Sequence, residues 1–460
     1  MEKKDNYILH FLKSTGLLFI GVVLPKVVVF LLLSFNTAHI GTADYGYYDL
    51  SINVSTLLSY LLFFDIWITT MRFLCDPEFS NDKDNVIRSG NVIFLLSSAL
   101  FTCIGAVFCC FVKPVYGAVV MILCILQNLS NMYSFSARGL GKDRDFAVSG
   151  VLGSIVLGLL NYALIKYAGW DFRALYWSAI AGYFVQCLYL ELKCGYMRTV
   201  LASKPEKTIT EKMFRFTLPM GIGALAFWVL NSFDKIVLTY VLDLESGGIY
   251  AVAERLAGMI TFAVQCFTYA WQDIAFRHES DDEGSFYSLA TSLYMIFLSA
   301  GIAMILPGIR IIFPFFIGEA FSDASMIIPV AIIAAAVSGL SLFINNIFYA
   351  IHETNASTKL SLLSCAFNLA ICYPCIKHFG IAGASVAIIC SFCLDSILKS
   401  WDLHKKIRYM VSWLALAASA VLTVISCIIY FTCSVLINCI WLIACLLSFG
   451  FLAYRYILKK

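Results

Sequence analysis

The sequence has few charged residues. Asp, Glu, Lys and Arg together make up 13% of its 460 residues, whereas soluble domains carry about 25%. Hydrophobic residues account for 61%, and the mean hydropathy is +0.84. This composition excludes an ordinary soluble domain and indicates a chain that crosses a membrane many times. The net charge of +3 is too small to indicate nucleic-acid binding.

The sequence also lacks the motifs of several classes of enzyme. It contains no P-loop of the form GxxxxGK[ST], so we expect no ATPase activity of its own. The 17 cysteines show no CxxC…CxxC pattern and most lie in apolar runs, which indicates small apolar residues instead of metal ligands. All six histidines fall in loops or at the ends of apolar runs. We therefore expect no catalysis, no metal and no cofactor.

Apolar runs predict an all-α polytopic membrane protein. The N-terminal residues 1–16 are polar, and the apolar run that follows has no small-residue cleavage site, so we expect an anchor and not a removed signal peptide. The stretch Ile305–Gly318 contains two prolines and is expected to lie at the membrane interface. A window of ~20 residues predicts about fourteen transmembrane helices: 14–35, 46–71, 89–112, 114–137, 146–165, 174–192, 214–240, 248–275, 286–306, 325–350, 358–376, 380–398, 410–431 and 434–454.

Basic residues predict the orientation. With both termini in the cytoplasm, 24 of the 32 Lys and Arg residues lie on the cytoplasmic side and 5 on the opposite side. The other three, Lys26, Lys235 and Arg255, lie within predicted spans. Because short cytoplasmic loops are enriched in Lys and Arg, this asymmetry predicts a multi-pass protein with both termini in the cytoplasm.

The longest internal polar loop predicts the domain organisation. We expect an N-terminal six-helix lobe over 1–200, a cytoplasmic linker over 201–212, a C-terminal six-helix lobe over 213–400 and an additional two-helix hairpin over 401–460. The segments GYYDLSINV, from Gly46, and GIYAVAERL, from Gly248, each open the second helix of their half. Such an echo predicts an internal repeat with a substrate site between the halves.

Four charges stand inside the otherwise apolar stretch Leu218–Leu256, namely Asp234, Lys235, Glu254 and Arg255. Ionisable side chains within a membrane span usually face a solvated cavity or one another. They are therefore candidates for a functional site. The alternative is that Asp234 pairs with Arg255 and Lys235 with Glu254, so that the charges only neutralise each other.

Three further charges fall on the first two predicted spans or directly after them. Lys26 lies in the middle of the first span, at a depth where the sequence offers no nearby acid. Asp65 and Arg72 are seven residues apart, on one face of the second span, and are as compatible with a solvated pair as with substrate contact. Asp65, Asp234 and Glu254 are also candidates for a site that couples H⁺ or Na⁺, because burial shifts carboxylate pKa values. Asp395 is expected to be a polar group near a helix end.

Several segments, in this order and spacing, resemble a known family. They are GTADYGYYDL (41–50), FDIWITTMRF (64–73), LPMGIG (218–223), NSFDKIVLTYVL (231–242), GGIYAVAERL (247–256), IGEAFSDAS (317–325) and FGIAGASVA (379–387). The chain resembles polysaccharide transporters of the multidrug/oligosaccharidyl-lipid/polysaccharide (MOP) exporter superfamily, and most closely the Wzx-like O-antigen and capsule flippases. It departs from them in having Asp234-Lys235 where an Asp-Arg pair is frequent, and in its fourteen predicted spans, which are nearer to lipid II flippases.

The resemblance implies two pseudo-symmetric, MATE-like lobes that translocate lipid-linked (undecaprenyl-pyrophosphate) oligosaccharide by alternating access. The implied location is the bacterial cytoplasmic (inner) membrane, in O-antigen, capsule or exopolysaccharide synthesis. Membrane lipids and the lipid-linked oligosaccharide are the implied partners, with a polysaccharide polymerase and glycosyltransferases as further ones.

The first two helices of each half line the cavity of such transporters. This placement makes Lys26, Lys235, Arg255, Asp65 and Arg72 the candidate substrate-binding residues, with Lys26 the first choice for attracting phosphate. The alternative is a cation-coupled, MATE-like exporter of small amphipathic molecules, for which we expect fewer cations and a more acidic pocket. The basic residues Lys26, Lys235 and Arg255 favour the flippase.

Overall fold

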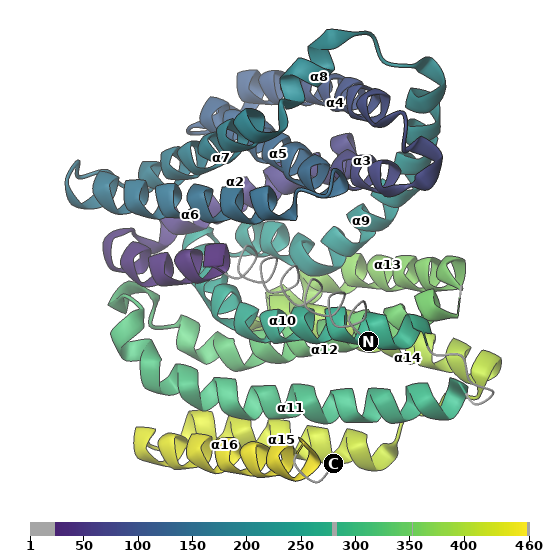
Figure 1. The fold of residues 1–460 in the computed structure, drawn as a ribbon. Coiled ribbons are helices and arrows are strands. Elements are labelled where there is room, and N and C mark those ends of the chain that lie inside the picture. The colour runs from purple at the N-terminus through teal and green to yellow at the C-terminus, as the bar shows by residue number, and fades with distance from the viewer. Residues whose placement is uncertain (1–23, 278–282, 352, 458–460) are drawn as a thin grey trace. The chain divides into compact units, whose positions relative to one another are not determined.

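The computed structural model describes residues 24–277, 283–351 and 353–457, and these are helical apart from short connections (Figure 1). The polar residues 1–16 and the start of the predicted anchor, up to residue 23, lie outside them. A helix Leu24–His39 comes first. It is followed by α2 (Thr42–Phe63), α3 (Ile66–Cys75), η1 (Pro77–Phe79), α4 (Lys83–Val112), α5 (Gly117–Gly139), α6 (Asp143–Lys166), α7 (Arg173–Cys194), α8 (Tyr196–Ala202), α9 (Lys207–Val241), α10 (Leu244–Arg277), α11 (Glu283–Phe316), η2 (Glu319–Phe321), α12 (Ala324–Ala350), α13 (Thr354–Phe379), α14 (Ala382–Ile407), α15 (Trp413–Thr432) and α16 (Val435–Ile457).

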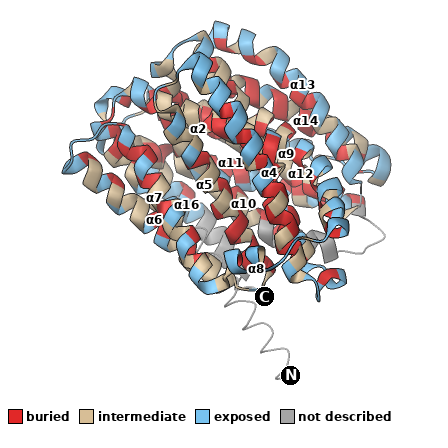
Figure 2. Ribbon diagram, turned by 90° about the horizontal axis from the view of Figure 1, so that it is seen from above, coloured by how far each residue is buried: buried red, intermediate tan, exposed pale blue. Residues whose placement is uncertain are grey.

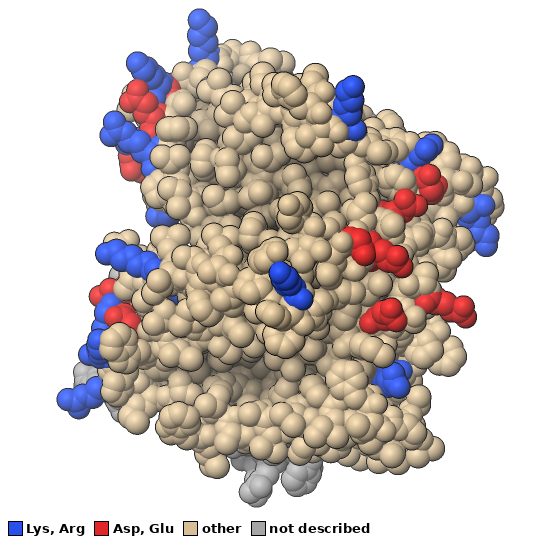
Figure 3. All heavy atoms as spheres, turned by 180° about the vertical axis from the view of Figure 1, so that it is seen from behind, with Lys and Arg blue, Asp and Glu red and all other residues tan. Residues whose placement is uncertain are grey.

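The helices confirm an all-α polytopic membrane protein. Among the described residues, ten helices are long and apolar enough to cross a membrane, and α2 with α3, bent by 49°, makes up to eleven. The remaining three predicted spans coincide with the helix Leu24–His39, α7 and α16, which are shorter or less apolar over the described residues. The count of fourteen therefore stays a prediction. Figure 3 shows charged side chains mainly toward the edges of one face, with mostly uncharged atoms between them.

One expected boundary is wrong. The stretch Ile305–Gly318 is not a separate interfacial segment, because α11 continues through Pro307 and Pro314 to Phe316. A proline removes a single backbone donor, and membrane helices tolerate this loss where neighbouring groups satisfy the freed carbonyl. At ~1.5 Å per residue, this helix of 34 residues is ~50 Å long.

Helix α9 belongs to two compact units. Its N-terminal part packs on unit 1, where the Thr217 hydroxyl donates a hydrogen bond to Thr69 at 2.9 Å, and its C-terminal part belongs to unit 2. The division inside this continuous helix differs from the expected lobe boundaries at 200 and 213, which remain a prediction. Unit 1 consists of the residues up to Ile40 and of Tyr48–Trp228, and unit 2 consists of Gly41–Tyr47 and of Val229 onward.

Each unit has a core of apolar side chains, and Figure 2 shows buried residues where helices face one another and exposed residues on outer surfaces. In unit 1 the Phe63 ring packs on Phe94, with ring centroids 5.4 Å apart. In unit 2 the rings of Tyr294 and Phe343 stack at 4.5 Å, and Trp271 lies 4.8 Å from Phe343. These rings connect α10, α11 and α12 into one layer of unit 2.

A buried ion pair lies in the middle of α14. The Lys399 ammonium is 2.8 Å from Asp395 Oδ2, and both side chains are almost fully buried. The Ser341 hydroxyl donates a 2.5 Å hydrogen bond to the same carboxylate oxygen, and Lys399 donates one of 3.2 Å to the Asn345 side-chain oxygen. Asp395 is therefore no helix-end group. It lies twelve residues before the end of α14 and is held by a cation one helical turn away and by α12.

Candidate functional site

The two similar segments that begin at Gly46 and Gly248 cross each other at these glycines. A Cβ on Gly46 would lie 1.9 Å from the Leu244 carbonyl oxygen, and one on Gly248 would lie 2.0 Å from the Thr42 carbonyl oxygen. Leu244 lies four residues before Gly248, and Thr42 lies four residues before Gly46. The first turns of α2 and α10 therefore contact each other in equivalent ways. Only glycine permits so close a backbone approach. The two short Gly-x-Tyr segments that resemble each other in the sequence therefore contact each other directly in the structure.

Arg255 lies over an aromatic ring beside this crossing. Its guanidinium carbon is 4.8 Å from the centre of the Tyr45 ring, which is a cation–π distance. Tyr45 is fully buried and packs edge-on against Phe321 of η2, at 5.7 Å between centroids. Three segments that carry the family resemblance, around residues 45, 255 and 321, thus meet within unit 2. The stacking fixes the orientation of a partly buried cation.

Asp234 is held by a tyrosine that the sequence analysis did not single out. The Tyr250 hydroxyl donates a 2.6 Å hydrogen bond to Asp234 Oδ2, and the Ser385 hydroxyl is 3.5 Å from that of Tyr250. Asp234 is 1% exposed, and its Oδ1 atom has no hydrogen-bond partner within the described residues. The result is a buried carboxylate with one oxygen available to a proton or a cation.

Lys235 forms the ion pair that was considered as an alternative. Its ammonium lies 2.5 Å from Glu254 Oε2, and both side chains are partly exposed. The structure thus forms one of the two expected pairs, while Asp234 has Tyr250 as a bonded partner. The hairpin of α9 and α10 brings all four charges of this stretch into unit 2. Two partly exposed cations and a buried acid suit the binding of an anionic group and the exchange of a proton or cation.

The break between α2 and α3 changes the expected placement of Asp65. Phe64 and Asp65 both have left-handed backbone angles, with φ values of 49° and 54°, which non-glycine residues rarely adopt. A Cβ on Gly221 of α9 would lie 2.5 Å from Phe64, so this glycine lets α9 approach the break. Asp65 is buried at the bend, as the N-cap of α3, whereas Arg72 is exposed in the last turn of the same helix. The expected common face of these two residues stays a prediction.

Arg72 and Lys26 occupy exposed positions in unit 1. The Arg72 guanidinium carbon lies 4.4 Å from the centre of the Phe216 ring, at the last turn of α3. Lys26 is exposed on the helix Leu24–His39. The seven candidate residues are therefore divided between the units: Lys26, Asp65 and Arg72 in unit 1, and Asp234, Lys235, Glu254 and Arg255 in unit 2. In the described part of the chain, no group of three or more His, Cys, Asp and Glu side chains is arranged to hold a metal.

Comparison with solved structures defines the class of fold. The structure is similar to that of the lipid II flippase MurJ in an inward closed conformation, with a TM-score of 0.71 and 13% identity over 97% of this chain and 100% of that one. It is also similar to an inward-facing multidrug resistance MATE family transporter of the MOP superfamily, with a TM-score of 0.68 and 14% identity over 85% of this chain and 98% of that one. The fold is therefore the one that MOP superfamily transporters share.

Sequence comparison gives the family. Residues 11–272 match the polysaccharide biosynthesis protein family, and the chain belongs to it. A comparison with curated proteins finds no match. The resemblance to polysaccharide transporters of the MOP superfamily is confirmed, whereas the closer likeness to O-antigen and capsule flippases stays a prediction. The family and fold agree with a membrane transporter and not an enzyme.

Proposed function

We propose that the protein is a flippase that moves lipid-linked oligosaccharide repeat units across the bacterial cytoplasmic membrane, for O-antigen, capsule or exopolysaccharide synthesis. The observation that carries this proposal is the match of residues 11–272 to the polysaccharide biosynthesis protein family, on a fold similar to that of a lipid II flippase. In this proposal both termini lie in the cytoplasm, and the glycosyltransferases and polymerase of the same pathway act before and after transport.

The charges supply the chemistry that such a cargo requires. A lipid pyrophosphate needs cations while its sugars cross the apolar layer, and a guanidinium binds phosphate oxygens through two parallel hydrogen bonds. Arg255 fits this role because Tyr45 fixes its orientation while leaving it partly exposed. We propose that Lys26 and Lys235 add to the attraction, and that Asp65 and Arg72 contact the substrate at the break in the second span.

Coupling to an ion is the second part of the proposal. Asp234 is buried, accepts one hydrogen bond through Oδ2 and keeps Oδ1 available, as a carboxylate that exchanges H⁺ or Na⁺ requires. Glu254 and Asp65 are the further candidates. Alternating access between two conformations then transfers the cargo, with no ATP hydrolysis by this chain.

The similarity to a MATE family transporter supports a second candidate function, a cation-coupled exporter of small amphipathic molecules. The two candidates differ in what the intramembrane cations do. A flippase needs them for phosphate, whereas an exporter of cationic amphiphiles is expected to tolerate their loss.

Arg255→Ala and Lys26→Ala are expected to abolish surface polysaccharide while leaving the protein in the membrane. Losing two charged hydrogen bonds of ~1.5–3 kcal/mol each corresponds to well over a tenfold loss of substrate affinity. The measurement is glycan display in a strain that depends on this protein, with the amount of membrane protein determined in parallel. Arg173→Ala is the matched control, because Arg173 is exposed, pairs with Asp171 and lies over the Tyr116 ring, and contacts none of the candidate residues in these interactions. Normal display in both test variants would remove the phosphate role.

A further inference from the structure

A groove of about 410 Å³ opens in unit 2 where α14 ends and the chain turns into α15. This volume lies within the ~300–1,000 Å³ that small-molecule sites occupy. The groove is lined by residues of α11, α12, α14 and α15, most of them apolar, and among them are Ile397, Trp401, Trp413 and Leu416. It includes none of the residues to which transport has been assigned.

The outer wall of the groove is exposed and aromatic. Trp413 is 81% exposed and Trp401 61%. Tryptophan side chains concentrate at the level of lipid headgroups, where the ring is apolar and its N–H remains wet. Leu416 and Ile397 continue the wall from there along α15 and α14. The groove therefore runs from the membrane interface into the apolar layer.

The floor of the groove is rigid and contains an unsatisfied hydroxyl. Tyr409 is buried and donates a 2.9 Å hydrogen bond to the Thr291 hydroxyl. Burial raises its pKa to about 12, so it stays a neutral donor. Ser396 also lines the groove, is 8% exposed, and its hydroxyl has no hydrogen-bond partner in the part of the chain that the structure describes. A buried hydroxyl in an apolar groove is satisfied by an acceptor such as an ester carbonyl oxygen.

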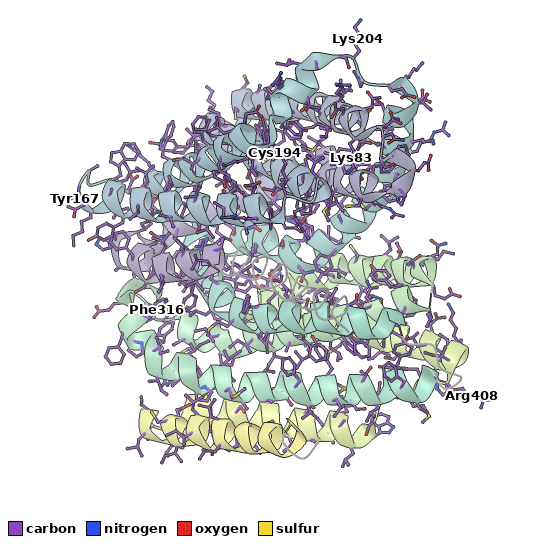
Figure 4. The ribbon with its side chains drawn as sticks, in the orientation of Figure 1. Lys83, Tyr167, Cys194, Lys204, Phe316 and Arg408 are labelled. Atoms are coloured by element: carbon purple, nitrogen blue, oxygen red, sulfur yellow. The ribbon has the colours of Figure 1, made fainter. Side chains whose placement is uncertain are left out.

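Two basic residues adjoin residues that line the groove, Lys405 through its contact with Trp401 and Arg408 as the chain neighbour of Tyr409. Lys405 lies over the Trp401 ring, with its ammonium 3.4 Å from the ring centre. Arg408 follows the last residue of α14 and is exposed; Figure 4 labels it at the opposite end of unit 2 from Phe316. The nearby acids Asp402 and Glu353 are both paired with Lys406. The rim therefore keeps a positive excess from Lys405 and Arg408.

We propose that this groove binds an anionic phospholipid of the cytoplasmic leaflet. One acyl chain lies along Ile397 and Leu416, the Ser396 hydroxyl donates a hydrogen bond to an ester carbonyl, and the phosphate lies between Lys405 and Arg408. Basic pockets between membrane helices on the cytoplasmic side bind anionic headgroups in this way. The end of α14, with Lys405 and Arg408, lies on the side that the distribution of Lys and Arg assigns to the cytoplasm. The site does not depend on which cargo is transported.

The test is retention of lipid by the purified full-length protein. The protein is equilibrated with equal amounts of phosphatidylglycerol and phosphatidylcholine with identical chains, and bound lipid is counted by native mass spectrometry. The wild-type protein is expected to retain one phosphatidylglycerol in preference to phosphatidylcholine. In Lys405→Gln/Arg408→Gln this preference should fall by at least about tenfold, since each basic residue at a membrane surface adds to anion binding.

Two further variants separate the groove from general surface charge. Leu416→Trp fills the groove without changing its charge and should remove the bound lipid. Lys204→Gln/Lys207→Gln removes the same charge from the loop before α9 and from the first residue of that helix, and should leave lipid binding unchanged. Equal retention of both lipids by the wild-type protein, equal losses in the rim variant and the loop control, or displacement of phosphatidylglycerol by added undecaprenyl phosphate would overturn the proposal.

Discussion

Lys399→Met is expected to lower the free energy of unfolding by about 3–5 kcal/mol. The Asp395 side chain is 1% exposed, and the substitution removes the ammonium that lies 2.8 Å from its carboxylate. A buried charge without a partner is costly. The Ser341 hydroxyl still donates to the carboxylate, but one neutral donor does not replace an ammonium. The measurement is denaturant-induced unfolding of the purified protein in detergent, followed by tryptophan fluorescence.

The control for this prediction is removal of both charges. Asp395→Asn/Lys399→Met should recover most of the lost stability, since replacing a whole buried pair is often close to neutral. Lys405→Met, on the exposed side of the same helix, should change stability little. If Lys399→Met unfolds at the same denaturant concentration as the wild-type protein, the pair does not stabilise α14.

Gly46→Ala and Gly248→Ala are expected to open the crossing of α2 and α10. The added Cβ atoms would lie 1.9 and 2.0 Å from backbone carbonyl oxygens, and backbone cannot move aside as a flexible side chain can. Overpacking of this kind costs about 1–3 kcal/mol or more. Because the crossing also positions Tyr45 beneath Arg255, polysaccharide display should fall together with stability.

A third glycine of α10 supplies the matched control. A Cβ on Gly258 would meet nothing within 4 Å, so Gly258→Ala should be neutral or slightly stabilising. Thermal unfolding and glycan display are measured on the same three variants. Equal behaviour of Gly248→Ala and Gly258→Ala would show that the close approach at the crossing is unimportant.

The helical content and the family could be predicted from the sequence, because both depend on signals along the chain. Apolar runs of ~20 residues predict membrane helices directly. Residues of the family motifs contact one another, as Gly46 does with the segment of Gly248 and Gly221 with Phe64. The order of the motifs therefore identifies the family better than any single motif does. The break at Phe64 and Asp65 was missed because no proline or glycine marks it.

The pairing of side chains between helices could not be predicted in the same way. The bond from Tyr250 to Asp234 depends on the rotation of α10 against α9, which the sequence of neither helix specifies. The Asp395–Lys399 pair had a local signal, a spacing of one helical turn, but its hydrogen bonds come from Ser341 and Asn345 of α12. The continuation of α11 through two prolines shows that neighbouring helices override a local break signal.

Transport of a lipid-linked oligosaccharide by the purified protein tests the central claim most directly. The protein is reconstituted into vesicles that carry a fluorescent undecaprenyl-pyrophosphate oligosaccharide in both leaflets, and a membrane-impermeant glycosidase reports the outward-facing fraction. We expect the wild-type protein to make the inner pool accessible and Arg255→Ala to leave it protected, with Arg173→Ala behaving as wild type. Protection of the inner pool by all three proteins, together with export of a small amphipathic cation by the wild type, would contradict the flippase and support the exporter.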